Sequence, residues 1–171
     1  MGTVDAGGTA DRVTLPVVVR DLLPEDLERC GWSGSPLHLA AVAKELTRVR
    51  AGEVDYLAVC PPSGLPVAIG AVDHVDRPGV GKLFQLVVHP ALRSCGLGTR
   101  LIAAAEHRVR VRGLAHAEID VEEDNSRARA LYERLGYVAY GSAPVGWDEE
   151  RTDGSVTRYE TVCTLMRKRL P

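Results

Sequence analysis

The chain has 171 residues, 45% of them hydrophobic and 26% charged, with a formal net charge of −2. This composition allows one hydrophobic core to form without disulfides or metals, and it excludes a strongly basic protein of the kind that binds nucleic acid. No apolar run approaches the roughly 20 residues that cross a bilayer, so we expect neither nucleic acid nor a membrane as a partner.

The cysteines and histidines do not form metal-binding patterns. The four cysteines are widely spaced without a Cys-x-x-Cys pair, and the five histidines show no ligand spacing. We therefore expect no metal and no disulfide framework. The first residues also lack the basic and then apolar pattern of a signal peptide, which favours a cytoplasmic protein.

The first part of the chain should contain one strand and two helices. Residues 1–12 are rich in Gly, Thr, Ala and Asp and are expected to be a flexible N-terminus, while residues 13–171 are expected to form one domain. β-Branched residues predict a strand over 13–20, and Pro24 with its acidic neighbours predicts a short helix. Ser35 is a suitable cap for a second helix, because Pro follows it and apolar residues then recur at helical spacing.

Three strands are expected next, at 56–60, 67–72 and 83–88, because turn-forming Pro and Gly residues separate them. Their simplest arrangement is an antiparallel succession. After a glycine-rich loop, apolar residues recur every four positions over 97–109 and predict an amphipathic helix. Gly113 is suited to the C-terminal cap of that helix.

The last part of the chain should contain a strand, a helix and a hairpin. Residues 117–122 alternate apolar and acidic side chains, as a strand with two unlike faces does. Asn125 is a suitable cap for the helix that follows. Segments 137–140 and 157–166 are rich in β-forming residues and flank a turn signal at 153–154, which predicts a long hairpin. This order of elements indicates an α/β protein.

The glycine-rich loop at 93–99 has the features of an anion site. A turn between a strand and a helix presents free backbone N–H groups and the positive end of the helix dipole. Gly96 and Gly98 allow close approach of the backbone, while the Thr99 hydroxyl and the Arg93 charge can add to binding. Such junctions also occur as ordinary connections, so the loop by itself leaves both interpretations open.

Two well-known nucleotide-binding loops do not fit this stretch. A Rossmann fingerprint needs a third glycine where this chain has Leu101, and a Walker loop needs a lysine where it has Thr99. A nucleotide-binding protein of either class is therefore disfavoured.

Two signatures lie on either side of the predicted helix. The first is an apolar strand that ends in Val-x-Pro and continues as Arg-x-x-Gly-x-Gly, which here spans 86–98. The second is a strand followed by Asn, Ala, Leu-Tyr-Glu and Gly-aromatic, which here spans 121–137. Together they resemble the central signatures of the GCN5-related N-acetyltransferase (GNAT) family, and the resemblance extends more loosely over 13–170.

The resemblance implies the GNAT acyl-CoA acyltransferase fold, with a mixed, mostly antiparallel central sheet that splays near Val88 and helices on both faces. It also implies acetyl-CoA as cosubstrate, with the pyrophosphate on the backbone amides of 93–99 and the pantetheine arm paired to the splayed strand end. The cofactor-binding residues implied in this way are Leu86, Val87, Val88, Arg93, Ser94, Cys95, Gly96, Leu97, Gly98, Thr99, Asn125, Ala128 and Tyr132.

Tyr132 is the expected proton donor. Asn125, Ala128 and Tyr132 share one helix face by three- and four-residue spacing, whereas Leu131 and Leu135 are expected to point toward the core. A phenol, whose ordinary pKa is about 10, can protonate or hydrogen-bond a thiolate, and the matching Tyr of the family often has this role. The alternative is that Tyr132 only packs beside coenzyme A.

Asp120 is the expected general base. It lies beside Val121 on the predicted strand and alternates with the apolar face. Family members that acetylate the N-terminal alanine of a ribosomal protein, to which the strand 83–86 is also similar, have an acidic residue proposed as base at this position. Asp is shorter than the Glu usual there, so proton transfer would need a water. Rival groups are Glu118, Glu122, Asp73 and His74, and a merely solvated carboxylate is the alternative.

The resemblance therefore implies an N-acetyltransferase that acts by direct attack of a primary amine on acetyl-CoA in a ternary complex, because thioester aminolysis needs no covalent enzyme intermediate. The acceptor is either a peptide or protein N-terminus or a small amine. A non-catalytic acyl-CoA-binding sensor or regulatory subunit is the alternative. Cys95 lies at a helix start but has no base paired with it in sequence, so it is interpreted as part of the loop and not as a nucleophile.

Acceptor recognition is expected in the least recognisable segments, 30–34 and the hairpin near Trp147. The acidic run 148–150 would attract a cationic acceptor, although such runs are more often solvated turns. The sequence leaves the acceptor amine and the oligomeric state open, a homodimer included.

Overall fold

The computed structural model describes residues 13–171, and the expected flexible N-terminus, 1–12, lies outside the described residues. The strands are β1 (Val18–Asp21), β2 (Val54–Cys60), β3 (Ala68–Asp73), β4 (Val80–Val88), β5 (His116–Glu122), β6 (Val138–Glu150) and β7 (Val156–Arg169). The helices are α1 (Pro36–Arg50), α2 (Leu97–Val111) and α3 (Ser126–Arg134), with short 3-10 helices η1 (Pro24–Arg29), η2 (Gly31–Ser33) and η3 (Pro90–Leu92).

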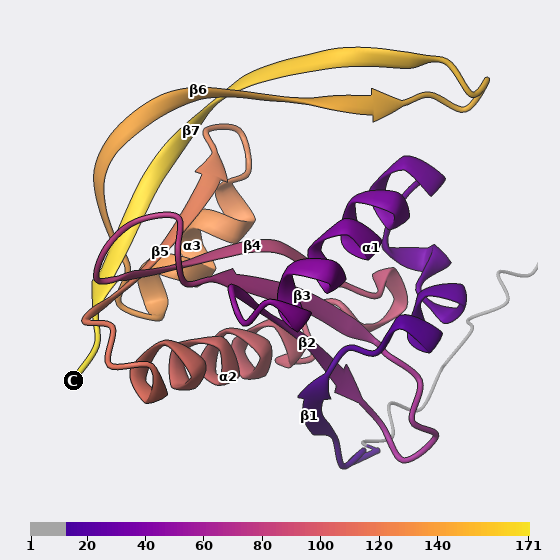
Figure 1. Cartoon of the computed structure of the whole chain (residues 1–171), viewed down its shortest axis with the longest axis horizontal. Coiled ribbons are helices and arrows are strands. Elements are labelled where there is room, and N and C mark those ends of the chain that lie inside the picture. The colour runs from indigo at the N-terminus through magenta and orange to yellow at the C-terminus, as the bar shows by residue number, and fades with distance from the viewer. Residues whose placement is uncertain (1–12) are drawn as a thin grey trace, which may run out of the picture.

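The strands form one seven-stranded sheet in the order β1-β2-β3-β4-β5-β7-β6. Every neighbouring pair is antiparallel except β4 and β5, which are parallel. Helix α2 covers one face of the sheet and α1 the other, and each face has its own buried apolar cluster (Figure 1). This arrangement confirms the expected mixed, mostly antiparallel sheet with helices on both faces.

Capping residues determine where two of the helices begin, as their positions in the sequence indicate. The Ser35 Oγ accepts a hydrogen bond from the His38 N–H at 3.3 Å, and Pro36 occupies the first position of α1. The Asn125 Oδ1 accepts from the Ala128 N–H at 3.1 Å at the start of α3. In both cases a side chain satisfies one of the backbone donors that a helix start leaves without a partner.

The first strand is shorter than expected. The prediction of a strand over 13–20 is wrong for its first five residues, because β1 begins only at Val18. Val18 pairs with Cys60, the last residue of β2, and two prolines follow Cys60. Since proline has no N–H to donate, the ladder ends there, and residues before Val18 have no strand to pair with.

Strand β4 leaves its neighbour β5 halfway along its length. The two pair from Val80 to Leu83, where Leu83 lies opposite Ile119, and no further. Just beyond this point the register with β3 shifts, so that Gln85 and Leu86 together oppose Gly70, and Gln85 has a left-handed φ of 51°. Such a bulge bends a strand. The sheet therefore splays directly after Leu83, several residues before the expected point near Val88 (Figure 1).

Two buried residues hold this bulge in place. The Tyr56 hydroxyl, on β2, donates a hydrogen bond to the Gln85 Oε1 at 3.0 Å, and Tyr56 is 1% exposed. A Cβ at Gly70 would lie 2.3 Å from the Leu86 Cδ2, so only glycine leaves room for Leu86 to lie over β3. The position of Leu86 thus depends on a residue of the neighbouring strand.

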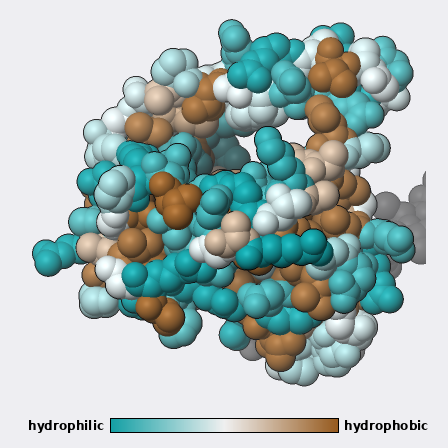
Figure 2. All heavy atoms as spheres, viewed as in Figure 1, coloured by the Kyte–Doolittle hydropathy of each residue, from teal (hydrophilic) through white to brown (hydrophobic). Residues whose placement is uncertain are grey.

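Strands β6 and β7 form a hairpin longer than the segments 137–140 and 157–166 that predicted it. Only Cys163–Arg169 of β7 pairs with β5, so residues 144–162 project beyond the sheet as a two-stranded extension, which we call the hairpin arm. Pro144 fits in this ladder because β6 is an edge strand, whose outer N–H groups need no partner. The arm curves over α1 and leaves an opening between itself and the body of the molecule (Figures 1 and 2).

The acidic face of β5 is not a simple solvated face. Glu118 is 0% exposed and forms ion pairs with Arg77 and with Arg167, whose Nε lies 2.6 Å from the Glu118 Oε1. Asp120 and Glu122 are half-buried on the same face. Burial of a carboxylate requires such paired charges, which alternation in the sequence does not reveal.

None of the helices within residues 13–171 is both long and apolar enough to cross a membrane.

Substituting Gly70 tests the origin of the split. We expect Gly70→Ala to lower the free energy of unfolding by about 1–3 kcal/mol, because the added methyl group overpacks the Leu86 side chain. Urea denaturation of both proteins measures the change. The matched control is Gly31→Ala, where a Cβ meets nothing within 4 Å and the change should stay within about 0.5 kcal/mol. Equal stability of Gly70→Ala and the parent protein would contradict this account of the bulge.

Candidate active site

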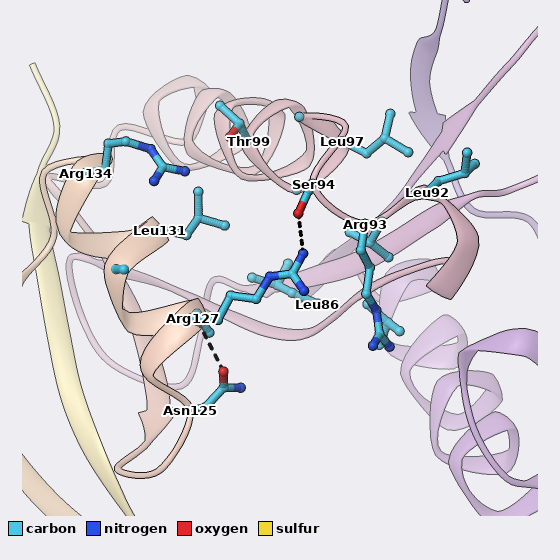
Figure 3. A pocket seen from close by; sticks show the side chains of 16 residues that line it. Leu86, Leu92, Arg93, Ser94, Leu97, Thr99, Asn125, Arg127, Leu131 and Arg134 are labelled. Atoms are coloured by element: carbon cyan, nitrogen blue, oxygen red, sulfur yellow. Dashed lines mark hydrogen bonds between the residues drawn. The ribbon is translucent and has the colours of Figure 1, made fainter. Parts of the chain in front are cut away.

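A cleft of about 710 Å³ lies between the end of β4, the glycine-rich loop and α3 (Figure 3). We call it the loop cleft. Its lining residues are Leu86, Val87, Val88, Leu92, Arg93, Ser94, Gly96, Leu97, Gly98, Thr99, Asn125, Arg127, Ala128, Ala130, Leu131 and Arg134. All the residues that the sequence pointed to as cofactor-binding lie here except Cys95 and Tyr132. Cys95 is exposed at the outside of the loop, with its Sγ 3.7 Å from the Arg93 carbonyl oxygen.

The loop presents its backbone to the cleft. Gly96 has a φ of 81°, a left-handed conformation that favours glycine, and it caps α2 without any side-chain hydrogen bond. Ser94 also has a positive φ of 65°. The first N–H groups of α2 therefore face the cleft at the positive end of the helix dipole, an arrangement that attracts an anion.

The charged residues that line the loop cleft are all basic. Arg93, Arg127 and Arg134 contribute to the lining, and no carboxylate of the described residues 13–171 does. The Arg127 Nη2 donates to the Ser94 Oγ at 2.6 Å, so this side chain spans from α3 to the loop. The sequence interpretation missed Arg127 and Arg134, although their seven-residue spacing, with Leu131 between them, places all three on one helix face.

Leu131 and Tyr132 do not divide between core and cofactor cleft as the sequence predicts. Leu131 packs against the core, as expected, but it also lines the loop cleft. Tyr132 instead lines a second cavity, of about 1080 Å³, on the other side of β4. The expected face of Asn125, Ala128 and Tyr132 is thus divided between the two hollows, because the short helix α3 lies between them.

The second hollow lies under the hairpin arm, and we call it the hairpin cavity. It is lined by Ser33, Gly34, Ser35, Leu37, His38, Ala40, Ala41, Lys44, Leu83, Phe84, Gln85, Leu86, Val87, Ile119, Asp120, Glu122, Tyr132, Trp147, Asp148, Glu149 and Glu150. Leu86 and Val87 line both hollows, so the loop cleft and the hairpin cavity meet at the split in the sheet. The segments 30–34 and the hairpin near Trp147, where the sequence predicts acceptor recognition, both contribute to this lining.

Tyr132 is held beside the junction by burial and aromatic packing. Its ring lies 6.2 Å from the Tyr137 ring, centroid to centroid. Burial raises the pKa of the Tyr132 phenol to about 12, because the charged phenolate is poorly solvated there. The phenol therefore remains protonated at neutral pH and can donate a proton.

Carboxylates dominate the charged lining of the hairpin cavity. Asp120 forms an ion pair with Lys82, and Glu122 accepts a hydrogen bond from the Tyr159 hydroxyl at 3.2 Å. The Glu150 Oε2 accepts from the Leu37 N–H at 3.0 Å and so ties the hairpin arm to the start of α1. Within the described chain, Glu122, Glu149 and Glu150 form no ion pair. A positively charged molecule is the ligand that such a lining attracts.

Three of the four rival bases lie outside both hollows. Asp73 pairs with Arg48 at 2.6 Å, the His74 Nε2 lies 2.8 Å from the Asp55 Oδ2, and Glu118 is buried among arginines. These groups stabilise the fold. Of these four rival bases, only Glu122 lines the hairpin cavity together with Asp120.

His38 is a cavity residue that the sequence interpretation missed. It lies on α1, and a Cβ at Gly34 would come within 2.8 Å of its ring, so glycine there allows the ring to pack against the backbone. Burial lowers the pKa of His38, which keeps the imidazole neutral near pH 7. Among residues 13–171 its Nε2 is buried and has no hydrogen-bond partner. No group of His, Cys, Asp and Glu side chains within these residues is arranged to hold a metal ion.

Comparisons with known sequences agree on one family. The model of the acetyltransferase (GNAT) family matches residues 25–137. A mycothiol acetyltransferase of Mycobacteroides abscessus is 38% identical over 76 residues, which are 41% of this chain and 26% of that protein. A mycothiol acetyltransferase of Rhodococcus jostii is 33% identical over 103 residues, 48% of this chain and 34% of that protein. The matched region thus spans about a third or less of these relatives.

Solved structures share the fold. The ribosomal-protein-S18-alanine N-acetyltransferase of Escherichia coli has a TM-score of 0.70 at 19% identity, covering 90% of this chain and 94% of that one. The PaiA N-acetyltransferase of Thermoplasma acidophilum, solved in complex with coenzyme A, has a TM-score of 0.65 at 16% identity, covering 91% and 100%. Because the family model covers well over half of its length, the chain belongs to the GNAT acetyltransferase family, whose cosubstrate is acetyl-CoA.

Proposed function

We propose that the protein transfers the acetyl group of acetyl-CoA to a primary amine by direct attack within a ternary complex. The observation that carries this proposal is the meeting of two hollows of opposite charge at the split in the sheet, where Leu86 and Val87 line both. The basic loop cleft suits the phosphates of acetyl-CoA, and the acidic hairpin cavity suits a cationic amine. We further propose that residues 13–171 act as one acetyltransferase unit.

Acetyl-CoA lies with its pyrophosphate against the backbone amides of residues 93–99 and its pantetheine arm along β4. Pairing with β5 stops at Leu83, so the β5 side of residues 85–88 is a free strand edge. Free N–H and C=O groups at such an edge pair readily with an extended ligand. This route brings the thioester to the junction between the loop cleft and the hairpin cavity.

The reaction then proceeds by addition and elimination. The neutral amine attacks the thioester carbonyl carbon, and the tetrahedral intermediate expels the thiolate of coenzyme A. Tyr132 gives its phenolic proton to the thiolate, and the proton lost by the amine goes to Asp120 or Glu122 directly or through a water. Proton exchange with solvent then restores the phenol and the carboxylate. No covalent enzyme intermediate is needed. Cys95 has no role in this scheme, because its thiol is at the outside of the loop.

The acceptor is a small molecule or peptide that presents a primary amine. The names of the relatives point to both kinds, mycothiol in one set and a ribosomal-protein alanine in another. The acidic lining from Asp148 to Glu150 supports an acceptor that carries positive charge. A non-catalytic acyl-CoA sensor would need the loop cleft alone, so the adjoining cavity with Tyr132 favours an enzyme.

Initial rates of thiol release test the proposed function. With acetyl-CoA and a panel of primary amines and peptides, we expect release that requires an amine and reciprocal plots that intersect, as sequential addition of both substrates predicts. Parallel lines would contradict direct attack and indicate a covalent intermediate. Binding of acetyl-CoA without release for any amine would favour the sensor.

Replacing Tyr132 tests its role as proton donor. We expect Tyr132→Phe to lower kcat by about 10²-fold while leaving the KM for acetyl-CoA nearly unchanged, because the phenol acts on the leaving thiolate. The alkaline loss of activity that belongs to this residue should appear only near pH 12. The matched control is Tyr140→Phe, since Tyr140 contacts Arg77 and Arg167 outside both hollows. An unchanged kcat in Tyr132→Phe would mean that Tyr132 only packs beside the cofactor.

A pair of isosteric variants identifies the base. We expect Asp120→Asn to lower kcat/KM for the amine by about 10²-fold, with a much smaller effect of Glu122→Gln. Thermal melting of both variants controls for loss of the ion pair with Lys82. The reverse order of effects would assign the base to Glu122, and two small effects would exclude both carboxylates.

A further inference from the structure

The wall of the loop cleft opposite the glycine-rich loop carries two positive charges. Arg127 and Arg134 both come from α3 and both line the cleft. They are seven positions apart, which is about two helical turns or about 10 Å along the axis, so they lie on the same side of α3. Figure 3 shows Arg127 reaching across to Ser94, with Arg134 at the far end of the helix near Thr99.

These two guanidinium groups have no neutralising partner in the described part of the chain. Their neighbour Arg129 forms an ion pair with Glu133 at 3.0 Å on another side of the same helix. Among residues 13–171, the Arg127 side chain forms one hydrogen bond, to the neutral hydroxyl of Ser94 at 2.6 Å. A guanidinium has five N–H donors, so Arg127 retains several for a ligand.

The position of the two arginines points to a second anion. One diphosphate at the backbone amides of the loop occupies the opposite wall of the cleft, where Gly96 and the first turn of α2 lie. Coenzyme A carries a further dianion, the phosphate on its ribose. Arginine is suited to phosphate because its planar fork can donate two parallel hydrogen bonds.

We propose that Arg127 and Arg134 form a second anion subsite in the loop cleft, which takes the ribose 3′-phosphate of coenzyme A. This inference rests on the proposed use of acetyl-CoA. On binding, Arg127 exchanges its hydrogen bond with Ser94 for the phosphate, so the subsite distinguishes coenzyme A from dephospho-coenzyme A and from ADP-like molecules.

Isothermal titration calorimetry with coenzyme A and dephospho-coenzyme A tests the subsite at one fixed salt concentration. We expect the parent protein to bind coenzyme A at least about tenfold more tightly than dephospho-coenzyme A, because the 3′-phosphate adds one or two charged hydrogen bonds. In Arg127→Gln/Arg134→Gln this preference should fall to nearly one, while the affinity for dephospho-coenzyme A stays unchanged. Glutamine can still hydrogen-bond Ser94, so the loop is expected to keep its conformation.

The matched control is Arg129→Gln, which removes a charge from the same helix outside the cleft and should retain the full preference. Thermal melting without ligand, together with the two single variants, separates loss of binding from loss of folding. No preference in the parent protein, or equal weakening of both ligands in the double variant, would overturn the subsite. Failure of the folded parent protein to bind either ligand would overturn the proposed function as well.

Discussion

The bulge that turns β4 away from β5 is the constraint on which the site depends. Gln85 adopts a left-handed conformation held by the Tyr56 hydroxyl, and Leu86 lies over Gly70 because no side chain is there. Backbone polar groups that lose a strand partner must find another one. The split therefore creates a free edge within the sheet, beside the two residues, Leu86 and Val87, that line both hollows.

The second organising feature is the opposite charge of the two hollows. The charged lining of the loop cleft is entirely arginine, whereas most charged side chains of the hairpin cavity are carboxylates. Fields of this kind attract anions to one side of β4 and cations to the other. The hairpin arm completes the acidic side, and the hydrogen bond from the Leu37 N–H to Glu150 ties it to α1.

The sequence predicted those parts of the fold that local chemistry determines. Ser35 and Asn125 indicated two helix starts because capping is a contact within one turn, and the alternation of β5 indicated a strand. The sequence predicted less about features that depend on contacts between residues far apart in the chain. The ladder of β1 ends where the prolines after Cys60 begin, and Glu118 is buried by arginines far away in the chain. At the site, helical spacing could have revealed Arg127 and Arg134, but the second signature indicates the face with Asn125, Ala128 and Tyr132 instead. His38 carries no motif at all.

Amide hydrogen exchange with and without saturating acetyl-CoA tests the central claim most directly, because it reports on the free edge and the loop separately. The account predicts slower exchange in residues 85–88 and 93–99, as the pantetheine arm pairs with β4 and the pyrophosphate covers the loop. It predicts little change in the hairpin arm until an amine acceptor is added. Unchanged exchange in both segments, in a protein that acetyl-CoA nonetheless stabilises against unfolding, would show that the cofactor binds elsewhere and would contradict the account.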